Sequence, residues 1–344
     1  MTQPASTHGH RPTIRDIADM VGVSIATVSR VLNDGPGVSS ETRALVRQAM
    51  EREGFRRLRR APRPSRVRDL ITVRCTYALE EYFGAVVSGI AQSLRARGKR
   101  LVLSTDTSDN GAPDLDHLLL TEITDGALLV LPPDDPTAFL ELRDSGYPFV
   151  LVDPRFTPPE DVAAVSVAHA AGARAATQHL IDLGHRRIAI ITGPPEQLSS
   201  DGRLSGYRSA LSGAGISAPD EYIRSAWEPD VNHGMSVSKA LLDLAEPPTA
   251  IVGFNDKVAI GAMRAATERG IDVPSQLSVV GFDALELSRL VHPPLTTVRQ
   301  PIDEMARIGV ELLLRLINGL EVEALHVELM CDLVLRSSTA PPPR

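Results

Sequence analysis

Cysteine and aromatic residues are scarce in this 344-residue chain. Its only two cysteines, Cys75 and Cys331, are far apart and fit no metal or redox spacing. We therefore expect both to be free thiols that pack as small buried hydrophobic residues in a reducing compartment. Aromatic residues make up 4% of the chain, so its cores must consist mainly of Val, Leu, Ile and Ala.

Long hydrophobic runs are missing too. No stretch of about 18 apolar residues occurs, which excludes a membrane-spanning helix. The first ten residues are polar and lack the apolar centre of a signal peptide. These two absences predict a cytoplasmic protein.

Motifs for catalysis, cofactors and metals are also absent. The glycines of 213–218 resemble a dinucleotide-binding loop but follow a predicted helix instead of a strand. Residues 202–206 are one residue out of register with a nucleophile elbow. His185 and His292 have no partners at metal-ligand spacing. We therefore expect no enzyme, no cofactor and no metal site.

Lysine does not occur in residues 1–68, whereas arginine is abundant there. This segment holds 13 arginines against six acidic residues, a net charge of +7, and the remainder of the chain carries −14. A basic head on an acidic body indicates that the head binds a polyanion. From charge alone, a solvated basic tail is an equally good interpretation.

Residues 12–55 read as a domain of three short helices. Thr13 is placed to cap the first helix, Gly22 ends it, and Ser24 caps a second helix that runs to Leu32. Ser39 or Ser40 caps the third. Small and apolar residues stand where a helix-turn-helix needs its packing contacts and its tight turn: Ala18, Gly22, Val23, Val28 and Val31. The alternative is a structural helical hairpin without a DNA role.

The second helix and its cap leave six residues pointing outward, away from the expected packing contacts. Its exposed positions are Ser24, Ile25, Ala26, Thr27, Ser29 and Arg30. Such a helix can enter the major groove of DNA with its N-terminal residues at the base edges. There Arg30 can bind a guanine with two hydrogen bonds, while Ile25 and Ala26 can contact a thymine methyl group.

Residues 56–68 form a linker rich in arginine and proline. It has too few apolar side chains to build a core. From Asp69 onward, short apolar runs alternate with amphipathic helices, which is typical of parallel sheets covered on both faces. At least seven such units favour two doubly wound lobes. We expect the body to span 69–336, with a disordered proline-rich tail after it.

Several motifs, in order along nearly the whole chain, resemble the lactose/galactose-repressor (LacI/GalR) family. The first covers Thr13–Asn33 and Val38–Arg43. The others are Leu183–Ile188, Arg203–Tyr207, Asn255–Ala262, Ser278–Asp283 and Pro293–Val298. The resemblance implies an α/β protein with a small all-α helix-turn-helix headpiece and a two-lobed body of the periplasmic sugar-binding type. It also implies a homodimer that binds a pseudo-palindromic operator and responds to a small-molecule effector.

The resemblance supplies further expected site residues and lobe limits. The DNA contacts extend to Thr13, Asn33, Ser39 and Thr42, with Leu58, Arg59 and Arg60 in the linker. Pro64 stands where relatives carry the leucine of a hinge helix, so we expect an extended arm instead. The first lobe is expected at about 69–165 plus 298–322, and the second at about 166–297 plus 323–336.

The expected effector site combines groups that suit a mono- or oligosaccharide. By resemblance it contains Arg203, Asn255, Asp283 and Trp227, and strand-end positions add Asp153 and, at the first body helix, Tyr82. Carboxylates, guanidinium and amide groups bind hydroxyls, and an indole covers the apolar face of a sugar ring. Alternatives remain for each: Trp227 as a core residue, Asn255 and Asp283 as helix caps, Arg203 in a surface ion pair.

The interpretation as a whole is a transcription repressor controlled by a sugar. The competing classes are a sugar-transport protein and a sugar-modifying enzyme. The headpiece and the missing signal peptide argue against the first, and the missing catalytic residues argue against the second. A purine effector or an activator role stays open within the regulator class. Because the C-terminus has no heptad extension, we expect a dimer in preference to a tetramer.

Overall fold

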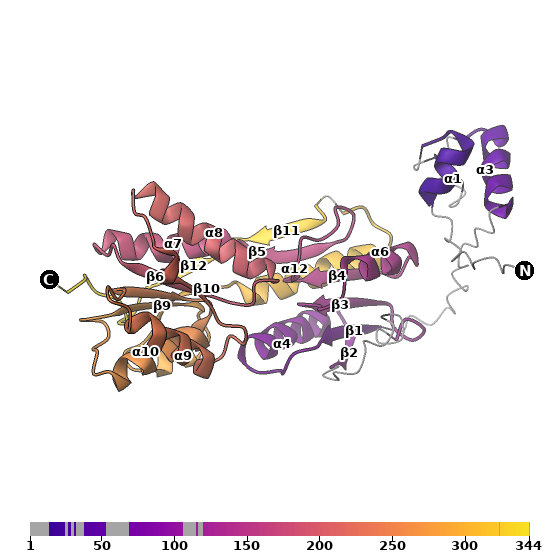
Figure 1. The fold of residues 1–344 in the computed structure, drawn as a ribbon. Coiled ribbons are helices and arrows are strands. Elements are labelled where there is room, and N and C mark those ends of the chain that lie inside the picture. Colours follow the sequence, from indigo (N-terminus) through magenta and orange to yellow (C-terminus); the bar gives the residue numbers. More distant parts are fainter. Residues whose placement is uncertain are drawn as a thin grey trace, which may run out of the picture. The chain divides into compact units, whose positions relative to one another are not determined.

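The chain divides into two units, residues 1–67 and 68–344. A computed structural model describes residues 14–24, 27–28, 31, 38–52, 69–105, 115, 120–322 and 324–343 (Figure 1). The first unit holds the helices α1 (Ile14–Val21) and α3 (Ser40–Arg52). No helix in the described ranges is long and apolar enough to cross a membrane.

The first unit has a small aliphatic core. Ile17, Ala18, Val28, Val31 and Val46 are buried together in it. Between α1 and the helical residues Thr27 and Val28, Gly22 adopts a φ of +70°, a left-handed conformation that favours glycine. The packing residues and turn expected for a helix-turn-helix therefore occur as predicted.

The second unit contains two six-stranded sheets, and the first has the order β11-β5-β4-β3-β1-β2 with all strands parallel. Its strands are β1 (Leu70–Cys75), β2 (Arg100–Ser104), β3 (Gly126–Val130), β4 (Phe149–Val152), β5 (Ala164–Val167) and β11 (His326–Leu329). Helices α4 (Glu81–Ala96) and α12 (Ile302–Ile317) contribute to the core on one face, and α6 (Pro136–Asp144) contributes to the core on the other.

The second sheet has the order β12-β10-β9-β8-β6-β7, and only β12 is antiparallel to its neighbour. Its strands are β6 (Ile188–Thr192), β7 (Ile223–Ser225), β8 (Ala250–Gly253), β9 (Ser278–Asp283), β10 (Thr296–Arg299) and β12 (Asp332–Val334). Helices α7 (His169–Asp182) and α8 (Leu198–Gly213) cover one face, and α9 (Val231–Leu242) and α10 (Asp256–Glu268) the other. Two short helices, η1 (Asp220–Tyr222) and α11 (Leu287–Leu290), complete the lobe.

The two sheets confirm a doubly wound, two-lobed body, but one expected lobe limit is wrong. Residues 323–336 were expected in the second lobe. Instead, β11 pairs with β5 in the first sheet, and only β12 joins the second. An apolar sequence pattern identifies a strand but not the sheet that the strand joins. Each of the two sheets ends in an edge strand that could accept another strand.

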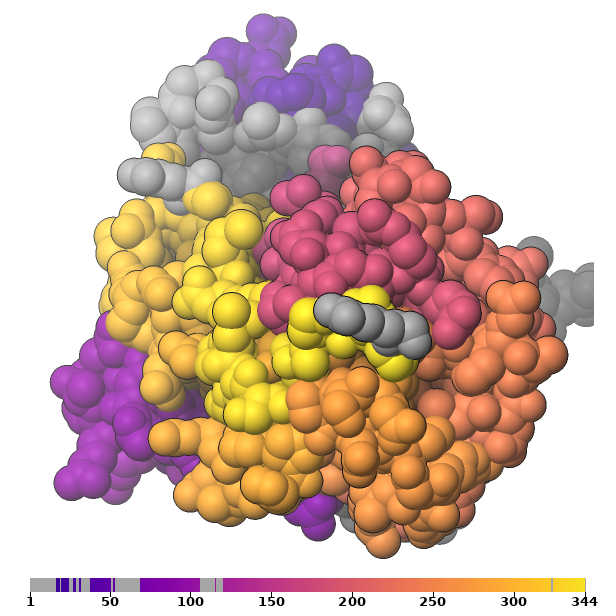
Figure 2. Space-filling view, turned by 90° about the vertical axis from the view of Figure 1, so that its left-hand side faces the viewer, coloured from indigo at the N-terminus to yellow at the C-terminus, as the bar shows by residue number. Residues whose placement is uncertain are grey.

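The proline-rich C-terminus is also not the disordered tail expected from its composition. Ser338 is fully buried, and its hydroxyl donates to the Val279 carbonyl while accepting from the Thr296 amide. His185 reaches the Ala340 carbonyl at 2.9 Å. The yellow C-terminal residues lie against the second lobe in Figure 2. Hydrogen bonds to β9 and β10 order this segment, and composition alone does not reveal them.

Candidate functional site

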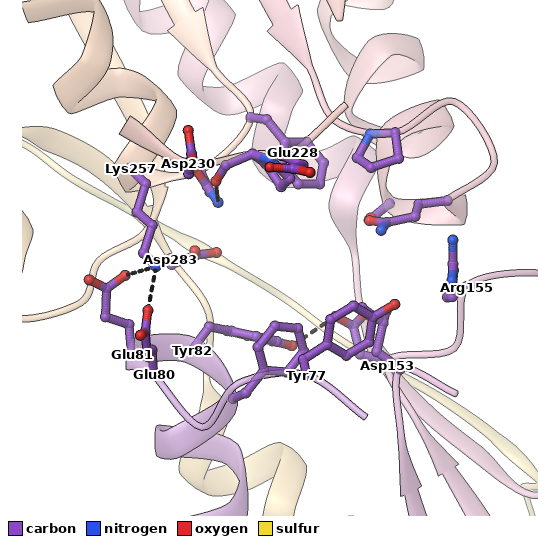
Figure 3. Close-up of a pocket in the computed structure, with 18 of the residues that line it drawn as sticks. Tyr77, Glu80, Glu81, Tyr82, Asp153, Arg155, Glu228, Asp230, Lys257 and Asp283 are labelled. Atoms are coloured by element: carbon purple, nitrogen blue, oxygen red, sulfur yellow. Dashed lines mark hydrogen bonds and ion pairs between the residues drawn. The ribbon is translucent and has the colours of Figure 1, made fainter. Parts of the chain in front are cut away.

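A cleft of about 660 Å³ lies between the two lobes and is lined by residues of both (Figure 3). It forms at the carboxyl ends of the strands, where open α/β sheets bind ligands. Four lining residues other than glycine have positive φ angles: Glu81, Leu131, Asp153 and Asp283. Backbone strain of this kind is concentrated at binding sites, where the surrounding packing can hold it.

All six residues expected to bind the effector line this one cleft: Tyr82, Asp153, Arg203, Trp227, Asn255 and Asp283. They come from α4, from the ends of β4, β7, β8 and β9, and from α8. The structure thus brings together side chains up to 201 positions apart in the sequence, from Tyr82 to Asp283.

Asp153 is held by partners from both lobes. Its Oδ1 lies 3.0 Å from Nε2 of His169 at the start of α7, and the Tyr82 hydroxyl donates to its Oδ2 at 2.8 Å. Burial acts to raise the pKa of Asp153, but His169, Tyr82 and Arg203 together lower it below the ordinary value. Asp153 is therefore an ionised group with both oxygens already engaged.

Arg203 is buried, so the alternative of a surface ion pair is wrong. Its guanidinium lies between the rings of Phe254 and Phe282, at 4.3 and 3.8 Å from their centroids. One amino group donates to the Phe254 carbonyl, and another lies 3.4 Å from Nδ1 of His169. Its Nε has no hydrogen-bond partner among the described residues. That buried donor is available to a ligand.

Asp283 lies at the base of the cleft with one oxygen engaged. Gln300 donates from Nε2 to Asp283 Oδ1 at 2.6 Å, while the buried Oε1 of Gln300 has no partner within the described ranges. Burial raises the pKa of Asp283 well above the ordinary carboxyl value, despite the nearby charge of Arg203. The base of the cleft therefore offers a donor, Arg203 Nε, an acceptor, Gln300 Oε1, and in Asp283 a carboxyl group that donates when protonated and accepts when ionised.

Asn255 and Trp227 line the cleft from the second lobe. Asn255 caps α10 by accepting from the Val258 amide at 2.8 Å, and its Nδ2 donates to the Pro229 carbonyl at 2.9 Å. The helix-cap interpretation of Asn255 is thus correct, although the residue also lines the cleft. Trp227 is 67% exposed, which excludes the core interpretation. On the opposite lobe, Tyr77 stacks on Phe83 with ring centroids 4.6 Å apart.

Ion pairs that sequence reasoning missed join the two lobes at the cleft. Lys257 of α10 lies 3.4 Å from Glu80 and 3.3 Å from Glu81, at the start of α4 (Figure 3). Arg155 lies 3.1 Å from Glu196. Each pair joins residues 41 or more positions apart, and no local motif predicts such a contact.

One group at the rim has the composition of a metal site. Ligand atoms of Glu228, Asp230 and His233 lie within 4.8 Å of one another. Asp230, however, already accepts from the amide and the ring of His233 while capping α9. This use explains the group as a helix cap, and we assign no metal to it.

The expected DNA-contacting residues are only partly within the described structure. Ser24 accepts from the Thr27 amide and Ser39 from the Thr42 amide, each at 3.1 Å, as helix caps do. In each pair the two hydroxyls lie 2.8 Å apart. The remaining nine expected contacts lie outside the described residues: Thr13, Ile25, Ala26, Ser29, Arg30, Asn33, Leu58, Arg59 and Arg60.

Burial of Asp283 should make stability depend on pH. A carboxyl whose pKa is raised on folding binds more protons in the native state, so its contribution is complete below about pH 4 and is lost as the pH rises through the raised value. We expect the unfolding free energy of the wild type to fall, relative to that of Asp283→Asn, between pH 5 and about pH 8. Urea unfolding of both proteins across this range measures the difference, and a constant difference would contradict the assignment.

Comparison with known proteins agrees with both parts of the structure. Residues 13–57 match the model for bacterial regulatory proteins of the lacI family, and residues 177–339 match the periplasmic binding protein-like domain. The chain is 34% identical to the HTH-type transcriptional regulator CelR of Thermobifida fusca, over 95% of this chain and 98% of the relative. It is 35% identical to MalR of Streptomyces coelicolor, over 96% and 97%.

Solved structures give the same result. A CelR–cellobiose complex has a TM-score of 0.72 at 32% identity and covers 95% of this chain and 100% of its own. A lac repressor dimer bound to operator and the anti-inducer ONPF has a TM-score of 0.69 at 30% identity, covering 96% and 100%. With near full-length relatives above 30% identity, the chain belongs to the LacI family of bacterial transcription regulators.

Proposed function

We propose that this regulator is a dimeric repressor whose operator affinity is controlled by a sugar bound in the interlobe cleft. The observation that carries the proposal is the composition of the cleft: buried polar groups at its base and aromatic faces on opposite lobes. Trp227 and the Tyr77–Phe83 stack can cover the apolar faces of sugar rings. Because a repressor must reach its operator on the bacterial DNA, we propose that the protein works in the cytoplasm.

The size of the cleft favours a small oligosaccharide. A volume of about 660 Å³ is within the range of ligand sites for drug-sized molecules. The relative whose structure contains cellobiose supports the same class. Arg203 Nε, Asp283 and Gln300 Oε1 suit hydroxyl groups, which both donate and accept.

We propose further that the cleft binds its ligand without turning it over. Hydrolysis of a glycoside needs two carboxyl groups free to act as acid and base or nucleophile. Here both oxygens of Asp153 are engaged by His169 and Tyr82, and one oxygen of Asp283 by Gln300. Of the acidic residues nearer the rim, Glu80 and Glu81 pair with Lys257, Glu196 pairs with Arg155, and Asp230 caps α9. Incubation with cellobiose and maltose and analysis for released glucose tests this point, and product formation would refute it.

The effector proposal is tested by thermal shift of the full chain against a panel of mono-, di- and trisaccharides. A binder at about 100 times its Kd should stabilise the protein by about 2.7 kcal/mol. The same sugar should then change the affinity for operator fragments in a gel shift. If no sugar of the panel stabilises the protein but purines or nucleosides do, the proposal that the effector is a sugar is refuted.

Operator recognition is expected to depend on Arg30, which the sequence places on the exposed face of the second headpiece helix. Arg30→Ala should lower the ratio of operator to random-DNA affinity by about 1–3 kcal/mol per half-site, because one bidentate base contact is lost. Arg52→Ala, an exposed arginine at the end of α3, is the matched control. An unchanged affinity ratio in Arg30→Ala would remove this residue from base recognition.

A further inference from the structure

The charges that line the cleft are mostly negative. Among the described lining residues, seven are acidic and three are basic. Burial raises the pKa of one of the seven, Asp283, to about 8, so that it adds its charge only in alkaline solution. The acidic residues are Glu80, Glu81, Asp153, Glu196, Glu228, Asp230 and Asp283, and the basic ones are Arg155, Arg203 and Lys257. Low-dielectric walls that carry one sign of charge focus the field within a cleft and repel ligands of the same sign.

The two cations at the mouth are already paired with carboxylates. Lys257 lies between Glu80 and Glu81, whose charges raise its pKa although burial acts to lower it. Arg155 is paired with Glu196. An anionic ligand that approached either cation would have to displace a carboxylate or lie against one.

The third cation, Arg203, is enclosed at the base. The rings of Phe254 and Phe282 lie against its guanidinium, and the carboxyl groups of Asp283 and Asp153 lie near its charge. A phosphate or carboxylate at Arg203 Nε would therefore meet the Gln300 carbonyl oxygen, which only accepts, and, where Asp283 is ionised, a second acceptor of like charge. A hydroxyl satisfies this set, because it accepts from Arg203 and donates to its neighbours.

We propose that the effector sugar carries no anionic group, so that sugar phosphates and uronic or aldonic acids are excluded by charge. This inference rests on the proposed function, since it specifies the class of sugar that the cleft accepts. The Lys257–Glu80–Glu81 group contributes directly to the exclusion of anionic sugars, because it holds two carboxylates and only one cation and therefore carries a net negative charge. Like charges placed together are a common device by which binding sites reject unwanted ligands.

Calorimetric titration of the full chain tests the proposal with cellobiose and maltose and with their 6-phosphates. The neutral disaccharide that binds should do so at least about tenfold more tightly than its phosphate. Raising the salt concentration from about 0.05 M to about 0.5 M should reduce this ratio, since screening weakens charge repulsion but leaves steric exclusion unchanged. Glu80→Gln/Glu81→Gln should also reduce the ratio, because it leaves Lys257 without its carboxylates.

Glu304→Gln/Glu311→Gln is the matched control. These two acids flank Arg307 on the exposed surface of α12, outside the cleft, as Glu80 and Glu81 flank Lys257. The control should keep the wild-type ratio. Equal or tighter binding of a phosphate, or a ratio that neither salt nor Glu80→Gln/Glu81→Gln changes, would overturn the inference and leave a sugar effector in place. Binding of no sugar would refute the proposed function, and the inference with it.

Discussion

Gly206→Ala is expected to destabilise the second lobe by about 3 kcal/mol or more, the upper end of what overpacking costs. A Cβ at this position of α8 would lie 2.1 Å from the Ala170 carbonyl oxygen and 2.8 Å from the Arg174 amide nitrogen. Both contacts are with the backbone of α7, which cannot rotate away as a side chain can. The methyl group is therefore accommodated only if the two helices separate.

Gly213→Ala is the control, because it changes the same residue type at the end of the same helix. A Cβ there meets nothing within 4 Å, so the substitution should be neutral or stabilise by up to about 1 kcal/mol. Urea unfolding measures both variants. Similar midpoints for the two would show that α7 and α8 do not need their close approach at Gly206.

Asp283→Asn is expected to leave operator binding intact and to lower the affinity for the effector about 10- to 150-fold. The substitution keeps the shape of the side chain, and asparagine tolerates the positive φ of this position. At about pH 8 and above, where the carboxylate form of Asp283 is populated, the substitution removes a hydrogen bond to a charged acceptor, which contributes about 1.5–3 kcal/mol. The measurement is the effector concentration that half-releases the operator, compared with that of Asp332→Asn, an exposed residue of β12 outside the cleft.

The pH dependence of this effect provides a second check. Because burial raises the pKa of Asp283, the wild-type residue takes up a proton as the pH falls and then resembles the amide. The difference between the two proteins should therefore shrink from pH 8 toward pH 5. An effector response of Asp283→Asn at wild-type concentrations at pH 8 would remove Asp283 from the site.

Local sequence patterns predicted most of the body but not its lobe assignments. The apolar runs at β1, β3, β4, β6, β8 and β9 were recognisable because these buried parallel strands are apolar along most of their length. The strands β5 and β7 were not recognisable, because Ser166 interrupts the first and two of the three residues of the second, Arg224 and Ser225, are polar. The sheet joined by β11 depends on pairing with β5, a contact between residues about 160 positions apart.

The candidate site was predictable where a residue follows a strand or belongs to a family motif. Asp153 and Asp283 end apolar runs, and the fold alone carries such positions to the cleft. Gln300, Tyr77 and the ion pairs of Lys257 were missed, because their roles arise from side chains that meet only after both lobes have formed. Within the described headpiece, the buried positions were predictable because helix periodicity determines them.

The order of segments in the two sheets has a consequence for synthesis on the ribosome. The chain passes between lobes at Ala168, at Gln300–Pro301 and again at Met330–Cys331. The first lobe lacks α12 and β11 until the whole of β6–β10 has been made, although domains otherwise tend to fold from the N-terminus as they emerge. The apolar face of β1, β3 and β4 that α12 covers is then exposed while the second lobe is translated. A nascent chain of this protein should therefore bind chaperones until residue 317 has emerged.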